Sequence, residues 1–139
     1  MLVSAHRGAP PYSAPKRPLQ LVRALSQMVC SDMHPLHTTR LIDYLGQALS
    51  LKHGSIDSWI AYWCNIGLSA IEALTGNDGY CVGGAISMAD VFLVPEVYAA
   101  RRFKVDLAPF KRIRRVEERC NSLEPFQLAH PQRQPDAAP

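Results

Sequence analysis

Apolar residues recur at steps of three and four along most of the chain, which is the spacing of one face of an α-helix. The first stripe follows Pro18, a residue suited to the first turn of a helix. His34-Pro35 interrupts the pattern, because proline disfavours helix at the residue before it. The spacing predicts one long helix bent near Pro35, or two helices in line. The apolar positions are Leu19, Val22, Leu25, Met28 and Val29, then Leu36, Leu41, Tyr44, Leu45 and Leu49.

The clearest amphipathic pattern comes next. Ser55 is a candidate N-cap, and Asp57 and Ser58 fall in the first turn after it. The run Gly76-Asn77-Asp78-Gly79 has the composition of a helix stop and a turn. The pattern predicts a helix that starts at Ser55 and has core or interface anchors at its two tryptophans. Its apolar face comprises Trp59, Trp63, Ile66, Ala70, Ile71 and Leu74.

The stretch 87–102 combines a helix start signal with an almost continuous apolar run. Ser87 can cap the first turn, and the side chain of Asp90, three residues later, can accept a hydrogen bond from the Ser87 N–H. Pro95 lies inside the run and removes one helical hydrogen bond. We therefore expect a kinked helix in the middle of a helical domain, with structural capping roles for Ser87 and Asp90.

The rest of the chain predicts less structure. A helix starting at Pro109 has a charge run that we interpret as a solvated face, and residues 123–127 favour one more turn. No stretch has a convincing strand pattern. The sequence predicts an all-α fold of about five helices, with a helical domain at 17–128. Residues 1–16 are interpreted as a disordered leader, and residues 129–139 as an extended polar tail.

Composition narrows the function classes. The 139 residues are 47% apolar and 19% charged, which is typical of one globular domain. The net charge is +3, and the basic residues are scattered rather than gathered on one face, so nucleic acid is not an expected partner. No apolar run approaches the roughly 18 residues of a membrane span. We expect a cytoplasmic protein that binds no membrane.

The four cysteines and the histidines show no metal-ligand spacing. Cys30 and Cys64 lie on apolar faces and are expected to be buried thiols. Cys81 lies at the start of a loop, where it is accessible to reagents, but nothing near it in sequence would lower its pKa. His34 and His37 can face one way on a helix, yet two histidines without a third ligand make a poor metal site. We therefore expect no metal.

Several stretches read together resemble the C-terminal domain of zeta-class glutathione transferases, the maleylacetoacetate and maleylpyruvate isomerases. The bacterial members look most similar. The capping segment is common to most glutathione transferases, whereas its combination with RRFKVDL and the HPxxQPDA tail is far more specific. The stretches are CSDMHPL at 30–36, WIAYWCNIGLSAIEAL at 59–74, YCVGG at 80–84, SMADVFLVPEVYAARRFKVDL at 87–107 and LEPFQLAHPQRQPDA at 123–137.

The resemblance implies an enzyme that uses glutathione to isomerise a cis double bond in a small dicarboxylic substrate. It implies glutathione contacts at His34, Thr38 and Thr39, although bacterial relatives usually have Asn-Asn where this chain has His37-Thr38. It implies that Arg40 and Arg102 face the substrate carboxylates, a task suited to the guanidinium fork. Without the resemblance, Arg102 is a cation that stabilises a helix C-terminus and Arg40 is a surface residue. His34 is then a residue that satisfies backbone groups near Pro35.

The family builds its thiolate site on an N-terminal thioredoxin-like domain with a Ser-Ser-Cys type motif. Neither that motif nor a βαβ pattern occurs in this sequence. We therefore expect the helical domain without the thioredoxin-like one, and the substrate-side half of an isomerase that is inactive as an isolated chain. The expected partner is a second copy, in a homodimer, or a thioredoxin-like domain. The alternatives are a non-catalytic dimerisation or binding module and a broken gene product.

Overall fold

The computed structural model describes residues 17–137, and every regular element in that range is helical. This confirms the all-α class with about five helices. The leader expected at 1–16 lies outside the described residues. The elements are α1 Arg17–Gln27, a π-helical turn Met28–Met33, a 3-10 turn His34–Leu36, α2 Thr39–Gln47, α3 His53–Leu74, α4 Met88–Arg102, α5 Lys111–Asn121, α6 Glu124–Ala129 and a 3-10 turn Pro131–Arg133.

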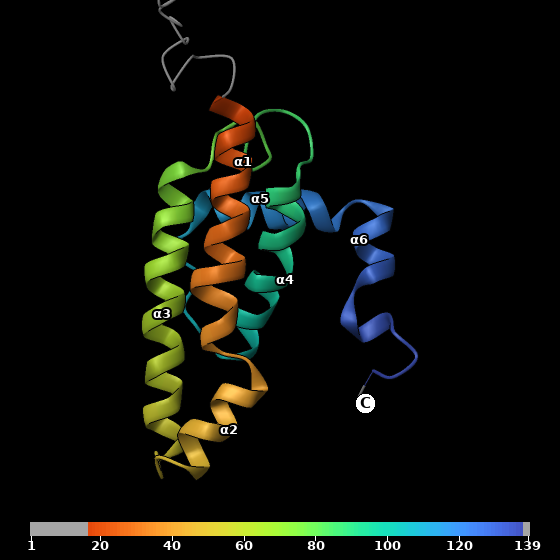
Figure 1. Cartoon of the computed structure of the whole chain (residues 1–139). Helices are drawn as coiled ribbons and strands as arrows, with labels where there is room; N and C mark the ends of the chain where they lie inside the picture. Colours follow the sequence, from red (N-terminus) through yellow and green to blue (C-terminus); the bar gives the residue numbers. More distant parts are fainter. Residues whose placement is uncertain (1–16, 138–139) are drawn as a thin grey trace, which may run out of the picture.

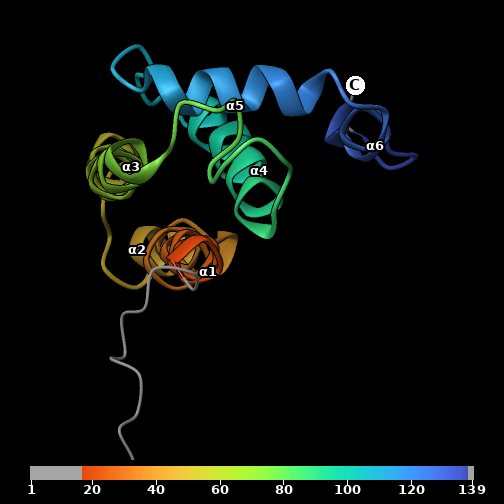
Figure 2. The ribbon, with the colours of Figure 1, turned by 90° about the horizontal axis from the view of Figure 1, so that it is seen from above.

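Helices α1, α3 and α4 stand side by side and enclose the core (Figure 1). Seen from above, α5 crosses α3 and α4, and α6 lies at the far end of α5, away from α1 and α3 (Figure 2). The helix faces that meet are apolar, so their burial is the main stabilising contribution. Helices α1, α3, α4 and α5 each contribute fully buried side chains to this core, namely Leu25, Leu68, Ile71, Leu93, Val97, Ile113 and Val116.

The bend expected near Pro35 is present and has two parts. Helix α1 first widens into the π-helical turn, whose last hydrogen bond runs from the His34 N–H to the Val29 carbonyl. It then tightens into the 3-10 turn, where the His37 N–H donates to the His34 carbonyl at 3.3 Å. The indole N–H of Trp59 on α3 donates to the Leu36 carbonyl at 2.9 Å. Trp59 therefore fixes this turn, which places His34 and His37 against α4.

The prediction of Ser55 as the N-cap of α3 is wrong, because the N-cap is Lys52, three residues earlier. The helix begins at His53 after Lys52, which has an extended backbone. The Lys52 carbonyl accepts hydrogen bonds from the N–H groups of Ser55, at 2.9 Å, and Ile56, at 3.2 Å. Backbone groups therefore form the first turn without a side-chain cap, and Ser55 lies inside it. The predicted end of the helix at Leu74 agrees with the structure.

Helix α4 begins after Ser87, with Asp90 fully buried beside it. Asp90 Oδ2 accepts hydrogen bonds from the Ser87 N–H at 2.8 Å and from the Ser87 hydroxyl at 2.7 Å. Asp90 Oδ1 accepts a third from the Cys81 N–H at 2.7 Å. The carboxylate thus joins the helix start to the preceding loop. The helix is less enclosed than its apolar run suggested, because Met88 and Val91 are 60% and 52% exposed.

Helix α5 begins at Lys111, two residues later than the sequence predicted. The Glu72 carboxylate on α3 accepts hydrogen bonds from the Arg112 N–H, at 2.9 and 3.1 Å, and from the Ile113 N–H, at 3.0 Å. A side chain about forty positions away in sequence therefore caps this helix. The solvated-face interpretation of its charge run fails at Glu117, which is buried.

Residues 129–137 form the described part of the expected extended tail. They contain the 3-10 turn and fold back on themselves. The side-chain amide of Gln134 donates to the carbonyls of Leu128, at 2.9 Å, and His130, at 3.2 Å. The boundary at 128 between the domain and the tail stays a prediction.

Candidate functional site

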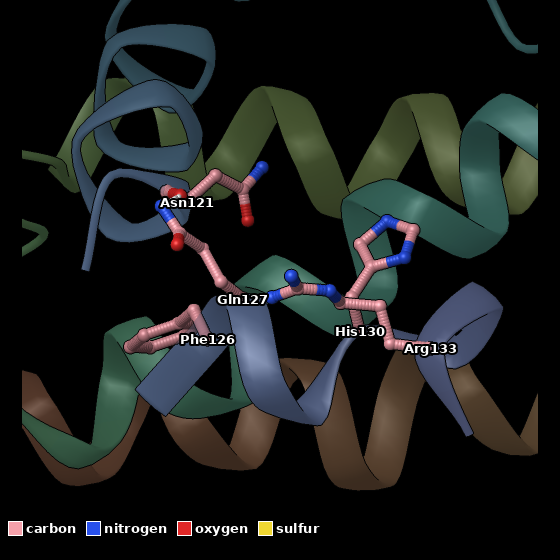
Figure 3. A pocket seen from close by; sticks show the side chains of 5 residues that line it. All are labelled: Asn121, Phe126, Gln127, His130 and Arg133. Atoms are coloured by element: carbon pink, nitrogen blue, oxygen red, sulfur yellow. Dashed lines mark hydrogen bonds between the residues drawn. The ribbon is translucent and has the colours of Figure 1, made fainter. Parts of the chain in front are cut away.

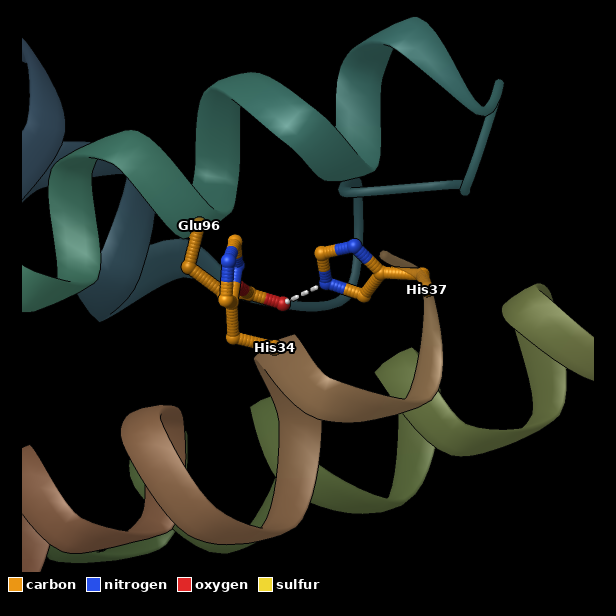
Figure 4. Close-up of side chains that lie close together, drawn as sticks. All are labelled: His34, His37 and Glu96. Atoms are coloured by element: carbon orange, nitrogen blue, oxygen red, sulfur yellow. Dashed lines mark hydrogen bonds and ion pairs between the residues drawn. The ribbon is translucent and has the colours of Figure 1, made fainter. Parts of the chain in front are cut away.

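Two histidines and one glutamate meet between the 3-10 turn and the middle of α4 (Figure 4). The His37 Nε2 atom lies 2.6 Å from Glu96 Oε1, a hydrogen-bond distance. His37 is 6% exposed and Glu96 is 2% exposed. The His34 side chain is 64% exposed, and its Nδ1 atom lies 3.7 Å from Glu96 Oε2. One buried carboxylate therefore faces two imidazoles of different exposure.

Local sequence explains this geometry. Pro35 suits a tight turn, and the 3-10 spacing of three residues brings His34 and His37 to the same side of the chain. Their rings meet edge to face with centroids 5.3 Å apart. The ring of Phe103 packs on His37 at 5.5 Å. On α4, the residue before Glu96 is Pro95, which has no backbone N–H to donate to the helix.

Burial and charge have opposite effects on the pKa of His37 in its contact with Glu96. Burial lowers the pKa of His37, but the hydrogen bond and the negative charge of Glu96 outweigh that effect, so its pKa lies above the ordinary value of 6.5. Glu96 Oε2 is buried and, among the described residues, makes no hydrogen bond. A buried carboxylate oxygen without a donor is uncommon and costly, so this atom calls for an explanation.

A cleft of about 490 Å³ opens beside the cluster. Arg102 lies at the C-terminal end of α4 and is exposed. Within the described residues Arg102 has no ion-pair partner, whereas its neighbour Arg101 holds Glu117 through two hydrogen bonds of 3.0 and 2.5 Å. The cleft thus has a cation available for an anionic ligand. Its lining comprises His34, His37, Thr38, Thr39, Ile42, Ala99, Arg102 and Phe103.

The structure places four of the predicted site residues together. His34, Thr38, Thr39 and Arg102 all line this cleft. Arg40 is exposed on α2 and is not among the lining residues, so its predicted substrate contact has no geometric support here. The capping pair Ser87 and Asp90 lies at the opposite end of α4, away from the cleft.

Sequence reasoning missed Glu96. The residue stands in the most apolar stretch of the chain, between Pro95 and Val97. A carboxylate in the middle of a helix expected to be buried is itself a signal, because such a group requires a charged or hydrogen-bonding partner. The partner came from a turn 59 positions away, which sequence spacing does not reveal.

A second hollow of about 280 Å³ lies between α5, α6 and the last 3-10 turn (Figure 3). The Gln127 side chain is already bonded to the Asn121 carbonyl at 3.1 Å. The His130 ring meets Tyr98 edge to face at 5.4 Å. Gln127 and His130 are therefore already engaged in contacts within the fold, so this hollow is a weaker candidate for a ligand site than the cleft beside Arg102. It is lined by Asn121, Phe126, Gln127, His130 and Arg133.

Three of the four cysteines are buried and offer no activated thiol. Cys81, which its loop position suggested was accessible, is buried, and burial together with the charge of Asp90 raises its pKa. Burial also raises the pKa of Cys64 to about 12 and that of Cys120 to about 11. Cys64 is buried as expected, whereas the same expectation for Cys30 is wrong, because Cys30 is only partly buried. The three buried thiols belong to the packing rather than to the chemistry.

Comparison with known proteins decides the family. The chain is 40% identical over 123 residues to the maleylpyruvate isomerase of a Ralstonia species, covering 86% of this chain and 58% of that protein. It superposes with a TM-score of 0.84 and 38% identity on a bacterial zeta-class maleylpyruvate isomerase, covering 96% of this chain and 64% of that one. With the maleylpyruvate isomerase of Pseudomonas aeruginosa PAO1 the TM-score is 0.83 and the identity 34%, over 91% of this chain and 68% of that one.

This chain belongs to the zeta class of glutathione transferases. The resemblance drawn from the sequence motifs is thereby confirmed. The chain spans about half the length of the curated zeta-class relatives it matches. No family model matches it. None of the described helices has both the length and the apolar character needed to cross a membrane.

Proposed function

We propose that this chain provides the substrate-binding side of a glutathione-dependent cis–trans isomerase that acts on maleyl-type dicarboxylates in the cytoplasm. The observation that carries the proposal is the cleft that joins Arg102 to His34, Thr38 and Thr39. A solved relative with 37% identity and a TM-score of 0.79, the maleylacetoacetate isomerase of Anaeromyxobacter dehalogenans 2CP-1, carries dicarboxyethyl glutathione and citrate in its active site. That protein therefore binds carboxylates and a glutathione adduct.

The residues of the cleft suit such a ligand. Arg102 is an exposed cation without an ion-pair partner in the described structure, and its guanidinium can hold a carboxylate through two parallel hydrogen bonds. Glutathione, when bound, supplies the thiolate that adds reversibly to the conjugated double bond. The role of Arg102 is to orient the diacid and to stabilise the negative charge that develops on it. Thr38, Thr39 and His34 offer donors to glutathione, and Arg40 is a further candidate for a carboxylate.

The expected ligand preference is testable on the chain as it stands. Maleate added to the ¹⁵N-labelled chain should shift the amide signals of Thr38, Thr39 and Arg102 with millimolar affinity. Arg102→Ala should weaken maleate binding by about tenfold, because one charge-assisted carboxylate contact is worth about 1.5 kcal/mol or more. Arg114→Ala, which removes an exposed arginine of α5, is the matched control and should bind like the wild type.

Two results would contradict this assignment. The first is maleate-induced shifts that lie outside the cleft or that are unchanged in Arg102→Ala. The second is glutathione binding tighter than millimolar by this chain alone, because the family places the thiol site on a thioredoxin-like domain and the described residues contain no strand.

The alternative function, a non-catalytic dimerisation or binding module, is favoured by exposed apolar side chains. Tyr62 and Ile66 on α3 are 60% and 48% exposed and lie one helical turn apart, on the same face. Met88 and Val91 at the start of α4 are also exposed. Such side chains suit contact with a second copy or with a thioredoxin-like domain.

We expect the purified chain to self-associate as its concentration rises, which sedimentation velocity would detect. Replacing Tyr62 and Ile66 with serine should shift the distribution toward monomer. Leu128→Ser, which removes a 62% exposed leucine of α6, is the control and should leave the distribution unchanged. A monodisperse monomer at high concentration would contradict the expectation, and so would an equal effect of Leu128→Ser.

A further inference from the structure

The cluster of His34, His37 and Glu96 has more ligand atoms than the hydrogen bond between His37 and Glu96 uses. That bond occupies Glu96 Oε1 and the Nε2 atom of His37. It leaves the second carboxylate oxygen buried and without a donor in the described structure. His34 Nδ1 faces this oxygen at 3.7 Å, too far for a hydrogen bond. The cluster therefore offers an unpartnered carboxylate oxygen and an exposed imidazole to a further ligand.

We propose that His34, His37 and Glu96 form a binding site for a divalent transition-metal ion of the Zn²⁺ type. One ligand atom from each residue lies within 4.8 Å of the others. In a tetrahedral zinc site with bonds of about 2.0–2.1 Å, the ligand atoms are about 3.3 Å apart. The separation between His34 Nδ1 and Glu96 Oε2 is already close to that value. Figure 4 shows all three side chains converging from the turn and from α4.

The donor set selects the class of metal. Two imidazoles, which are borderline ligands, and one carboxylate form a donor set that suits Zn²⁺, whereas Mg²⁺ and Ca²⁺ prefer sites made of oxygen atoms alone. Three protein ligands leave one position of a tetrahedral ion for another group. Because His34 and His37 line the cleft, water or a carboxylate from the cleft has access to that position. The expectation of no metal rested on a missing third ligand, and Glu96 now fills that place.

Binding exchanges a proton for the metal. A protonated His37 must lose the proton on Nε2 before that atom can bind a metal, and Nε2 and Glu96 Oε1, 2.6 Å apart in the hydrogen bond, must then separate so that the metal can bind Nε2 and the unpartnered Oε2. The displaced proton goes to the buffer. Because imidazole and carboxylate bind a metal only when deprotonated, metal affinity should increase with pH. The loss of the proton and the pH dependence of metal affinity are both independent of the proposed isomerase function.

The test is a titration of the full chain, purified without a histidine tag and stripped with a chelator, at about pH 8 where most imidazole is neutral. Zn²⁺ binding is followed by calorimetry in two buffers of different ionisation heat, and Co²⁺ binding by its visible absorption. We expect one saturable site and no competition from millimolar Mg²⁺. His34→Ala and Glu96→Gln should each weaken Zn²⁺ binding by about tenfold or more.

His34→Ala is the decisive variant, because its side chain is mostly exposed and its removal should leave the fold intact. His53→Ala, which removes an exposed histidine at the start of α3, is the matched control and should bind like the wild type. Absence of saturable Zn²⁺ binding overturns the proposal, as does unchanged affinity in His34→Ala. Loss of binding in His53→Ala alone would show an adventitious surface ion and would also overturn it. Maleate binding by the wild type without metal would leave the proposed function standing in each case.

Discussion

Replacing Asp90 with alanine is expected to lower the free energy of unfolding by roughly 3–5 kcal/mol, the largest effect of any single substitution considered for this chain. The Asp90 carboxylate is fully buried and accepts from the N–H groups of Cys81 and Ser87 and from the Ser87 hydroxyl. The variant leaves two backbone donors without their partner, each costing about 1–3 kcal/mol, and adds a cavity. Urea unfolding followed by circular dichroism measures the loss.

Two further variants make the result specific. Asp90→Asn keeps the shape but turns one acceptor atom into a donor, so it should lose an intermediate amount of stability. Asp106→Ala is the control, because Asp106 is exposed and accepts one hydrogen bond, from the Ala108 N–H at 2.9 Å. It should cost no more than about 0.5 kcal/mol. Equal losses of unfolding free energy in Asp106→Ala and Asp90→Ala would show that the buried hydrogen bonds of Asp90 contribute no more to stability than the exposed one of Asp106.

The two contacts of Asp90 separate what the sequence predicts from what it does not. Its contact with Ser87 spans three residues of one helix start, and such local spacing is visible in any sequence. Its contact with Cys81 depends on the path of the loop before the helix. The sequence therefore predicts the cap formed by Ser87 and Asp90. It does not predict the further stabilisation that comes from the Cys81 N–H.

The boundaries of the helices show the same division. The end of α3 follows from its own glycine-rich stop signal, and the prediction matches. The start of α5 depends on the carboxylate of Glu72, which arrives from α3, so Pro109 alone gave a boundary two residues too early. Helix ends fixed by neighbouring residues are predictable, whereas those fixed by tertiary contacts require the fold.

The candidate site depends both on residues that sequence motifs identify and on contacts that only the fold creates. Family motifs pointed to His34, Thr38, Thr39 and Arg102, and the structure gathers them around one cleft. Spacing alone could not place Glu96 beside His37, because the two residues meet only after α4 packs on the turn. Four residues that line the cleft were thus inferred from motifs, while the place of Glu96 beside the two histidines came from the packing.

The buried pair of His37 and Glu96 should make stability depend on pH with a definite sign. Because the folded pKa of His37 is raised above 6.5, the stabilisation from its charge is fully present below about pH 6.5 and is lost as pH rises through that raised pKa. Glu96→Gln keeps the shape and removes the negative charge, so it should cost on the order of 1–3 kcal/mol near pH 6. The cost should be smaller near pH 9, where His37 is neutral in both proteins.

Urea unfolding at stepped pH, with chelator present, measures the difference between wild type and variant. The ring signals of His37 in NMR spectra should titrate above 6.5 in the wild type, and at or below it in Glu96→Gln, because burial alone lowers the pKa of an imidazole. Arg102, the other charged group that lines the cleft, is present in both proteins. His34, whose Nδ1 atom lies 3.7 Å from Glu96 Oε2, also loses this contact in the variant, so the same comparison made in a His34→Ala background isolates the contribution of His37. A destabilisation by Glu96→Gln that grows from pH 6 to pH 9 would have the wrong sign, and would mean that the Glu96 charge does not stabilise a protonated His37.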